Sequence, residues 1–322
     1  MSNKILGVND GHGNSAALVT DTTTYHHIEG HVGFPFRSIQ EVLKLANLTI
    51  GDIDKVAMAT AFQGPLRFNS LPLLRARSPK LFAPLDRMFN RERIKRVRSL
   101  GFRGKICFVA HHDAHAASAY YSSPGGRDNM LVFTLDGAGD GLCATVNIGN
   151  GGKLRRISQT TSENSLGYIY GAVADLIGMS PFEVMTSAVP NSFSTLAFGA
   201  YTALKSYIGL DGLRFKKGFS GQIHDVKNLV RFDLREHKPL DIAAGLQRLT
   251  EELIIEWVYC AMEETGLGRI AAAGGVFLNT RANEHIRELL GAEGIFIPQS
   301  PGDESTSLGA AQYLFNKRWT KK

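Results

Sequence analysis

The stretch MLVFTLDGAGDGLCATVNI, residues 130–148, decides the fold of this chain. Its first six residues are a β-prone run, Asp136 to Gly141 form a glycine-rich turn, and Leu142 to Ile148 predict a returning strand. After the turn residues Gly149 to Gly152, we expect another strand at Lys153 to Ser158. The stretch therefore predicts a β-hairpin that continues into a third strand.

The beginning of the chain repeats this order. Lys4 to Asn9 reads as a strand, Gly11 to Asn14 as a tight polar loop, and Ser15 to Thr20 as a second strand. With 322 residues, the chain has the length of two lobes of roughly 100 to 200 residues each. The duplicated start predicts two pseudo-repeated lobes with a cleft between them.

The other segments alternate between helical and strand patterns. In the first lobe we expect a helix at 38–48, a strand at 55–60, helix within 79–100, a strand at 106–110 and a helix to about 121. In the second lobe we expect helices at 165–177, 191–207 and 243–264, a strand at 269–273 and a closing helix at 304–315. The turn residues SSPGGRD, Ser122 to Asp128, mark the boundary, so we place the lobes at 1–125 and 126–322.

The composition is that of an ordinary globular protein. Hydrophobic residues make up 43% and charged residues 20%, which excludes a mostly disordered chain. Cys107, Cys143 and Cys260 form no CxxC pair, so neither a disulfide framework nor a thiolate zinc site is indicated. No apolar stretch reaches about 18 residues. We therefore expect a cytoplasmic protein with no signal peptide and no membrane span.

The positive charge is concentrated in one stretch. Residues 67–105 contain twelve Lys or Arg residues against only Asp86 and Glu92. Such a stretch can attract nucleic acid, an acidic protein or an anionic substrate. The alternative interpretation is a solvated helical face, and the sequence leaves both open.

The segment HHDAHAASAYY, residues 111–121, contains the first candidate for chemistry. If a helix begins here, His111 and His115 lie four residues apart on one face, a spacing that can chelate a metal ion. The alternative is a helix start with partly exposed imidazoles that bind nothing.

Three further segments contain candidate residues. Asp136 follows a buried strand, where an unpartnered carboxylate would be costly, and the glycines after it allow backbone amides to approach a phosphate; the alternative is an ordinary Asx hairpin turn. IAAAGGVFLNTRAN, residues 270–283, pairs two glycines with Asn279, which suits a flat ring or sugar against the backbone; the alternative is close packing of a strand against a helix. Asp303 lies at a helix start, and taken alone it is best explained as a first-turn carboxylate.

Together these segments resemble one family. GHGNSAAL at 11–18, HHDAHAASAYY, LDGAGDG, SLGYIY at 165–170, AGGVFLN and DESTSLGAA at 303–311 follow in the order of the nodulation-factor, cephalosporin and tobramycin O-carbamoyltransferases. The resemblance is to their N-terminal domain over nearly the whole chain. That domain is itself similar to the universal tRNA threonylcarbamoyl-transfer proteins.

The resemblance implies an α/β fold of the actin-like, ribonuclease H-like (Kae1-like) type, with a divalent metal, expected to be Fe²⁺, between its lobes. The implied metal ligands are His111, His115, Asp136 and Asp303, a donor set that suits a first-row metal. Carbamoyl adenylate would be the donor: the metal polarises a phosphate oxygen, an acceptor hydroxyl attacks the carbamoyl carbon, and AMP leaves. His12 is the implied acid/base or orienting residue. The implied nucleotide-lining residues are Gly137, Gly139, Gly274, Gly275 and Asn279.

Three departures from the family shape the hypotheses. We expect the family's YrdC-like domain, which makes carbamoyl adenylate, to be absent from this chain. HHIEGHVGFPFR at 26–37 and EVMTSAV at 183–189 replace two family motifs. The leading hypothesis is a transferase half that acts on a small-molecule hydroxyl and works with a separate YrdC-like partner. The alternatives are a tRNA threonylcarbamoyl transferase, with the basic stretch on RNA, and a non-catalytic paralogue that binds metal or nucleotide.

Overall fold

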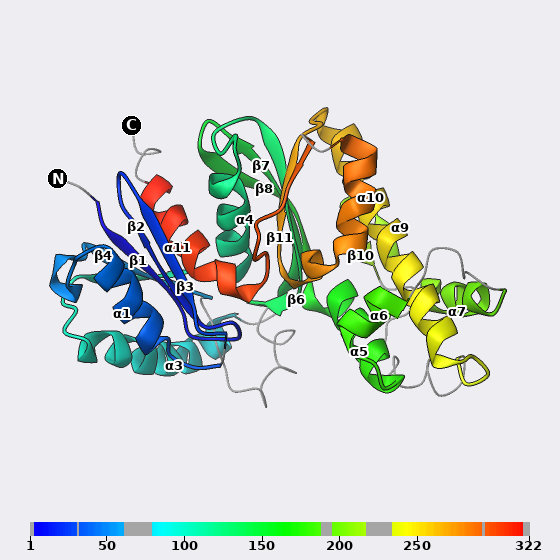
Figure 1. Cartoon of the computed structure of the whole chain (residues 1–322), viewed down its shortest axis with the longest axis horizontal. Helices are drawn as coiled ribbons and strands as arrows, with labels where there is room; N and C mark the ends of the chain where they lie inside the picture. Colours follow the sequence, from blue (N-terminus) through cyan, green and yellow to red (C-terminus); the bar gives the residue numbers. More distant parts are fainter. Residues whose placement is uncertain are drawn as a thin grey trace.

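The computed structural model describes residues 3–30, 32–60, 79–187, 195–216, 234–291 and 294–317. Within these residues two five-stranded sheets form the centres of the two lobes (Figure 1). The first sheet has the order β3-β2-β1-β4-β5, with β1 Ile5–Asn9, β2 Ser15–Val19, β3 Thr24–Ile28, β4 Lys55–Ala59 and β5 Lys105–Val109. The second has the order β8-β7-β6-β11-β12, with β6 Met130–Gly139, β7 Leu142–Asn150, β8 Lys153–Thr161, β11 Ile270–Ala273 and β12 Ile295–Phe296.

The two sheets have the same topology. In each, the first three strands form an antiparallel meander, the fourth strand pairs in parallel with the first, and the fifth pairs in parallel with the fourth. The duplicated hairpin starts predicted from the sequence are therefore confirmed, since β1 pairs with β2 and β6 with β7 in the same way.

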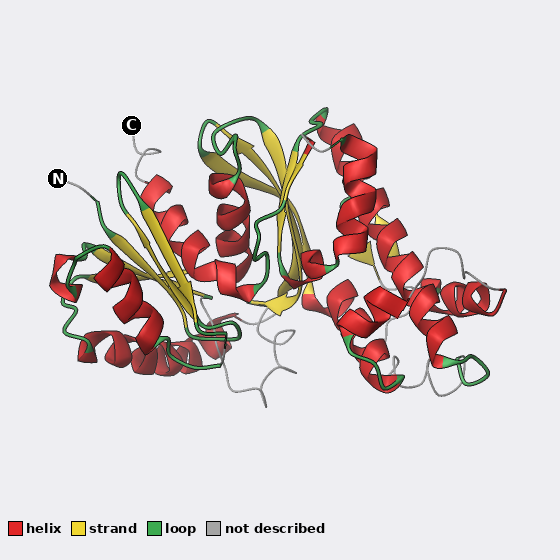
Figure 2. Cartoon of the chain, viewed as in Figure 1, coloured by secondary structure: helices red, strands yellow, loops and turns green. Residues whose placement is uncertain are grey.

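Helices separate and cover the sheets (Figure 2). Before β6 in the chain they are α1 Phe36–Leu45, α3 Pro79–Ser99 and α4 His111–Ser122. After β6 they are α5 Leu166–Leu176, α6 Pro181–Ser187, α7 Thr195–Lys205, α9 Pro239–Thr265, α10 Thr280–Leu290 and α11 Thr306–Asn316. A small hairpin, β9 Gly209–Asp211 with β10 Arg214–Lys216, and single 3₁₀ turns at Ile50–Asp52, Ser162–Asn164, Gly275–Leu278 and Asp303–Ser305 complete the described elements.

The central layer between the two sheets consists of α4 and α11. Helix α11 packs on β1, β2 and β4 and along α4, while α4 packs on β6 and β11 (Figure 1). The last described helix thus packs on the first sheet, although it follows the strands of the second sheet in the chain. The order of the elements in the sequence does not predict this return. A β-carbon at Gly7 would overlap the carbonyl of Ser307, and one at Gly309 would overlap the carbonyl of Ala114. Gly7 therefore allows the close approach of α11 to β1, and Gly309 allows its close approach to α4.

Several elements differ from the sequence-based expectation. Asp136 to Gly139 belong to β6 rather than to a turn, because a register shift between Leu135 and Gly139 lets the glycines stay in the strand. Helix α9 begins earlier than predicted, at Pro239, because proline fits the first helical turn. The short elements β3, α6, β9, β10 and β12 were not predicted. Residues 191–194 of one predicted helix lie outside the described residues.

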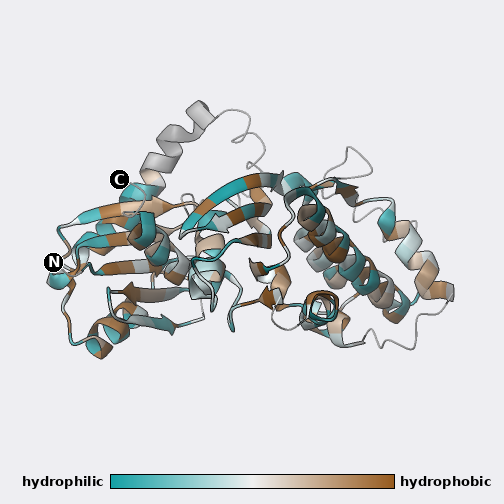
Figure 3. Cartoon of the chain, turned by 90° about the horizontal axis from the view of Figure 1, so that it is seen from above, coloured by the Kyte–Doolittle hydropathy of each residue, from teal (hydrophilic) through white to brown (hydrophobic). Residues whose placement is uncertain are grey.

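Apolar side chains fill the spaces between layers. The largest cluster lies between the second sheet and the helices around α9, where the buried Trp257 contacts Phe133 and Phe215. In Figure 3, polar and apolar residues alternate along the helices of this lobe, as expected for helices with one buried face. Among the described residues, none of the helices combines the length and apolar character needed to cross a bilayer.

Candidate metal centre

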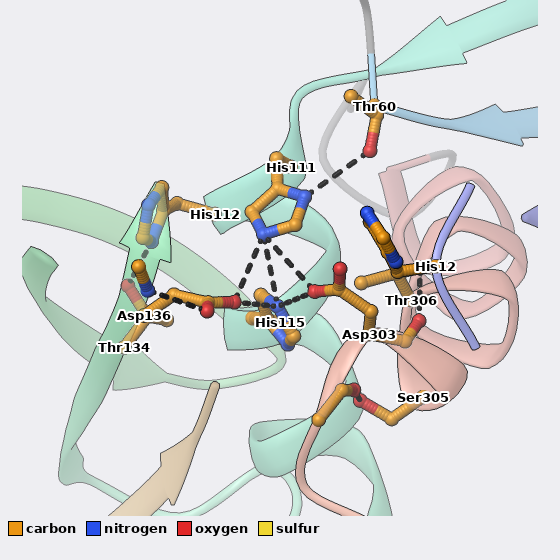
Figure 4. A network of polar contacts seen from close by, with 12 residues as sticks. His12, Thr60, His111, His112, His115, Thr134, Asp136, Asp303, Ser305 and Thr306 are labelled. Atoms are coloured by element: carbon orange, nitrogen blue, oxygen red, sulfur yellow. Dashed lines mark hydrogen bonds and ion pairs between the residues drawn. The ribbon is translucent and has the colours of Figure 1, made fainter. Parts of the chain in front are cut away.

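Four side chains from three parts of the chain converge beside α4 (Figure 4). His111 and His115 come from the first two turns of α4, Asp136 from β6, and Asp303 from the 3₁₀ turn before α11. One ligand atom from each residue lies within 4.8 Å of the others. The structure thus brings together all four residues that the sequence analysis named as metal ligands, although residues 111 and 303 are far apart in the chain.

The nitrogen and oxygen atoms of this cluster face one another. The two Nε2 atoms are 3.1 Å apart. Asp136 Oδ2 lies 3.1 Å from Nε2 of His111 and 3.0 Å from that of His115, and Asp303 Oδ1 lies 3.5 and 3.3 Å away. Two imidazole nitrogens this close repel each other unless a proton or a metal cation lies between them.

The protein environment attracts positive charge to this point. Burial lowers the pKa of His115, but the hydrogen bonds and charges of Asp136 and Asp303 outweigh it and raise the pKa to about 9. The same balance raises the pKa of His111. Burial raises the pKa of Asp136, yet the two imidazoles hold it well below the ordinary value. The two carboxylates therefore favour positive charge at the point where the imidazole nitrogens meet.

The donor set fits a first-row divalent metal. Two imidazole nitrogens and two carboxylate oxygens suit Fe²⁺ or a neighbouring metal better than Ca²⁺ or Mg²⁺, which prefer oxygen alone. His115 is fully buried and Asp303 is the most exposed ligand, so the site is open on the Asp303 side. The cluster is thus a possible metal site with one accessible face.

Neighbouring groups orient the two histidines. His111 Nδ1 lies 3.1 Å from Oγ1 of Thr60, and the backbone N–H of His111 donates to the carboxylate of Asp140. The ring of His112, by contrast, turns away and its Nδ1 lies 2.7 Å from Oγ1 of Thr134 (Figure 4). Sequence reasoning missed Thr60, which precedes its contact His111 by 51 positions in the chain, and it left Asp140 without a role. The second carboxylate in the motif DGAGD was the available signal for Asp140.

The loop that presents Asp303 is fixed to the first sheet. The side-chain amide of Asn9 donates to the carbonyl of Asp303, and the hydroxyl of Ser15 donates to the carbonyl of Glu304. His26 Nε2 also binds the carbonyl of Glu304, at 3.0 Å, and burial lowers the pKa of His26. In the segment HHIEGHVGFPFR, His26 therefore has a structural contact that sequence reasoning missed. His31 lies outside the described residues.

His12, the predicted acid/base residue, lies on the loop next to Asp303. Its backbone carbonyl accepts from the Asn9 amide that also binds the carbonyl of Asp303, and its side chain is exposed. Figure 4 shows the imidazole beside Asp303, on the open side of the cluster. Its catalytic role stays a prediction.

The predicted nucleotide-lining glycines border the metal cluster. A β-carbon at Gly139 would enter the imidazole of His111, and one at Gly275 would lie 3.1 Å from Oδ1 of Asp136. Gly274 has a φ of 113° and lies against the carbonyl of Leu135, while Gly137 faces the ring of Tyr168. These glycines give the ligands room, and their contact with a nucleotide stays a prediction.

Asn279 is held by protein contacts. Its Oδ1 accepts from the N–H of Ala282 at the start of α10, and its amide pairs with that of Gln247 in both directions. It therefore caps a helix in this structure, and its predicted contact with a nucleotide also stays a prediction.

Comparison with known proteins agrees with this architecture. Full-length HypF, solved in a phosphate- and nucleotide-bound form, superposes with a TM-score of 0.62 at 15% identity, over 99% of this chain and 56% of that chain. At this identity the likeness shows the fold alone. It confirms the actin-like, ribonuclease H-like fold class that the sequence motifs implied.

Sequence relatives point to one family. Residues 90–312 match the family model described as the carbamoyltransferase N-terminus. The nodulation protein NolNO of Sinorhizobium fredii is 27% identical over 88% of this chain and 42% of its own length. A tRNA N6-adenosine threonylcarbamoyltransferase of Prochlorococcus marinus is 25% identical over 98% of this chain and 83% of its own length.

The chain is an actin-like α/β protein with a candidate metal centre between its lobes. It belongs to the carbamoyltransferase N-terminal family. It spans between 38% and 57% of the length of three curated relatives that it matches.

Proposed function

We propose that this chain transfers a carbamoyl group from carbamoyl adenylate to an acceptor hydroxyl, using a divalent metal, Fe²⁺, at the cluster described above. The observation that supports the proposal is the convergence of His111, His115, Asp136 and Asp303 within 4.8 Å, in a chain of the carbamoyltransferase N-terminal family. When bound, the metal would supply Lewis-acid polarisation at the phosphate of the donor.

The residues of the chain have separate tasks in this proposal. His12, exposed beside Asp303, accepts the proton of the acceptor hydroxyl. The hydroxyl oxygen forms a bond to the carbamoyl carbon, the bond from that carbon to the phosphate oxygen breaks, and AMP leaves with the electron pair. The glycines Gly137, Gly139, Gly274 and Gly275 keep the backbone close to the nucleotide, because no side chain stands between them.

The supply of carbamoyl adenylate requires a second activity. The chain spans 38% to 57% of the length of three curated relatives, so those proteins contain further sequence that this chain does not match. We propose that a separate YrdC-like protein forms it from carbamoyl phosphate and ATP and passes it to this chain.

A second candidate function is transfer to tRNA. The relation to the Prochlorococcus enzyme over 98% of this chain favours it, together with the exposed basic residues Arg91, Lys95 and Arg96 on α3. Binding of tRNA that weakens steeply with salt would support this candidate over a small-molecule acceptor.

The first experiment is a metal and transfer assay on anaerobically purified protein. We expect about one equivalent of metal by mass spectrometry in wild type and in His112→Asn, whose ring points away from the cluster, and little metal in His115→Ala. With carbamoyl adenylate supplied, wild type should carbamoylate a member of a panel of polyols and amino sugars. His12→Ala should keep its metal but lose about 10²- to 10⁴-fold of the rate.

Each outcome decides between the hypotheses. Metal without transfer, even when a YrdC-like protein, carbamoyl phosphate and ATP are added, would favour a non-catalytic paralogue. Folded wild-type protein that binds neither metal nor a carbamoyl adenylate analogue would exclude carbamoyl transfer by this site.

A further inference from the structure

Arg93 is a buried arginine in the basic helix α3. Only 6% of its side chain is exposed, whereas the basic residues around it, such as Lys95 at 77% and Arg96 at 46%, face solvent. Its guanidinium therefore does not belong to the charged surface that the sequence predicted for residues 67–105. A buried guanidinium needs partners for its charge and its N–H groups, and the identity of those partners indicates its function.

The partners of Arg93 lie at the ends of two strands. Nε and Nη2 donate to both oxygens of the Asp10 carboxylate, at 2.7 to 3.1 Å. Nη2 also donates to the carbonyl of Ala59 at 2.7 Å, and Nη1 donates to the carbonyl of Thr60 at 2.8 Å. Asp10 directly follows β1 and precedes the loop with His12, while Ala59 ends β4 and Thr60 directly follows it. Arg93 thus fixes the exits of both strands.

Thr60 has an unfavourable backbone conformation. Its φ is 63°, in the left-handed region that a β-branched residue rarely adopts. The bond from Arg93 to the carbonyl of Thr60 helps hold this conformation. It also aims the hydroxyl of Thr60 at Nδ1 of His111, 3.1 Å away (Figure 4).

The Thr60 hydroxyl can accept a hydrogen bond from Nδ1–H of His111, which is the arrangement that a metal ion bound at Nε2 would require. If Nδ1–H donates to Thr60, then Nε2 presents its lone pair toward His115 and the two carboxylates. A second hydrogen bond of this kind is what metal-binding histidines ordinarily need to keep their ring orientation and tautomer. In the described part of the chain, Nδ1 of His115 has no hydrogen-bond partner. Of the two histidines of the cluster, His111 is therefore the one whose Nδ1 has a hydrogen-bond partner, the hydroxyl of Thr60.

We propose that Arg93 is a positioning residue of the metal centre, which acts through the strained Thr60 to hold His111 in its metal-binding tautomer. The inference rests on the metal site of the proposed function and adds a specific chain of contacts, Arg93 to Thr60 to His111, to it. A purely structural alternative exists, in which the pair of Arg93 with Asp10 only stabilises the first lobe.

The test compares two substitutions of Thr60, one that keeps its branched shape and one that keeps its hydroxyl. Thr60→Val keeps the branched side chain and removes the hydroxyl, whereas Thr60→Ser keeps the hydroxyl. Anaerobic titration with Co²⁺, followed by its visible absorption bands, reports both affinity and ligand geometry. We expect Thr60→Val to lower Co²⁺ affinity about 10- to 100-fold and to alter the bands, and Thr60→Ser to restore both.

Arg93 is tested in the same way. Arg93→Lys keeps the charge but cannot form the forked contacts to Asp10 and both carbonyls, so it should weaken Co²⁺ binding as Thr60→Val does. Arg96→Met, on the exposed face of the same helix, serves as the matched control and should bind Co²⁺ like wild type. Nitrogen-15 NMR of labelled histidine in the Zn²⁺-loaded protein should show the His111 Nδ1–H signal in wild type and its loss or shift in Thr60→Val.

The outcomes separate this inference from the proposed function. Wild-type protein that binds no Co²⁺ would overturn the metal site and the inference with it. Stoichiometric binding by wild type with equal affinity, bands and histidine signals in Thr60→Val and Arg93→Lys would overturn only the inference and leave the metal centre intact.

Discussion

At the scale of single residues, the absence of a side chain at Gly139 makes room for His111, the first of the proposed metal ligands. Gly139 lies buried on β6, and a β-carbon there would enter the imidazole ring of His111. The ring therefore occupies the space that a side chain on the strand would need. The sequence suggested that Gly139 serves a turn, but in the structure it allows β6 to pack closely against His111.

Gly139→Ala should lower stability by about 1–3 kcal/mol and abolish metal binding, because the new methyl group displaces the His111 ring. Urea unfolding followed by circular dichroism measures the first effect and metal content the second. The double variant His111→Ala/Gly139→Ala isolates the cause: without the ring, the added methyl group should cost much less. An equal cost in both backgrounds would show that the conflict lies elsewhere.

At the scale of elements, the crossing of α4 and α11 sets the distance between the histidines and Asp303. Helix α11 follows directly from the 3₁₀ turn that contains Asp303, and Gly309 lets it approach the carbonyl of Ala114 on α4. Helix position and ligand position are therefore coupled.

Gly309→Ala should push α11 away from α4, with a loss of about 1–3 kcal/mol in stability and weaker metal binding. Thermal unfolding and Co²⁺ titration report the two effects. Gly171→Ala in α5 is the matched control, since nothing lies within 4 Å of its added methyl group and alanine favours a helix. Unchanged Co²⁺ affinity in Gly309→Ala would contradict the coupling.

Some of the elements and ligands could be predicted from the sequence, and some of the contacts between them could not. Local patterns predicted both hairpins, helix α4 and its two histidines on one face, because periodicity and turn chemistry act over a few residues. Motif order supplied Asp136 and Asp303. The contacts of Arg93, Thr60 and His26 could not be predicted, because each depends on strands and helices distant in the chain meeting in space. Arg93 in particular looked like one more surface charge.

At the scale of the whole molecule, the candidate metal centre is built from residues that are anchored in both lobes. His111 and His115 lie in the central layer, Asp136 belongs to the second sheet, and Asp303 is tied to the first sheet through Asn9. A metal held by all of them acts as a crosslink between the lobes, and its binding energy contributes to the stability of the folded chain.

Removal of the metal should therefore destabilise the entire molecule. With free metal at 100 times its dissociation constant, the bound form gains about 2.7 kcal/mol, so a chelator should lower the unfolding temperature in calorimetry. His115→Ala should unfold at one temperature with and without chelator. If the metal-loaded wild-type protein unfolds at the same temperature with and without chelator, the metal does not crosslink the lobes.

The position of α11 against β1 also has a consequence for how the chain is made. Domains begin to fold from the N-terminal side while synthesis continues. The first sheet, however, receives the cover on its inner face only after residue 306 has left the ribosome, and Asp303, the last of the proposed ligands, emerges just before it. Under the proposed function, the complete metal site can therefore form only after both lobes have been translated.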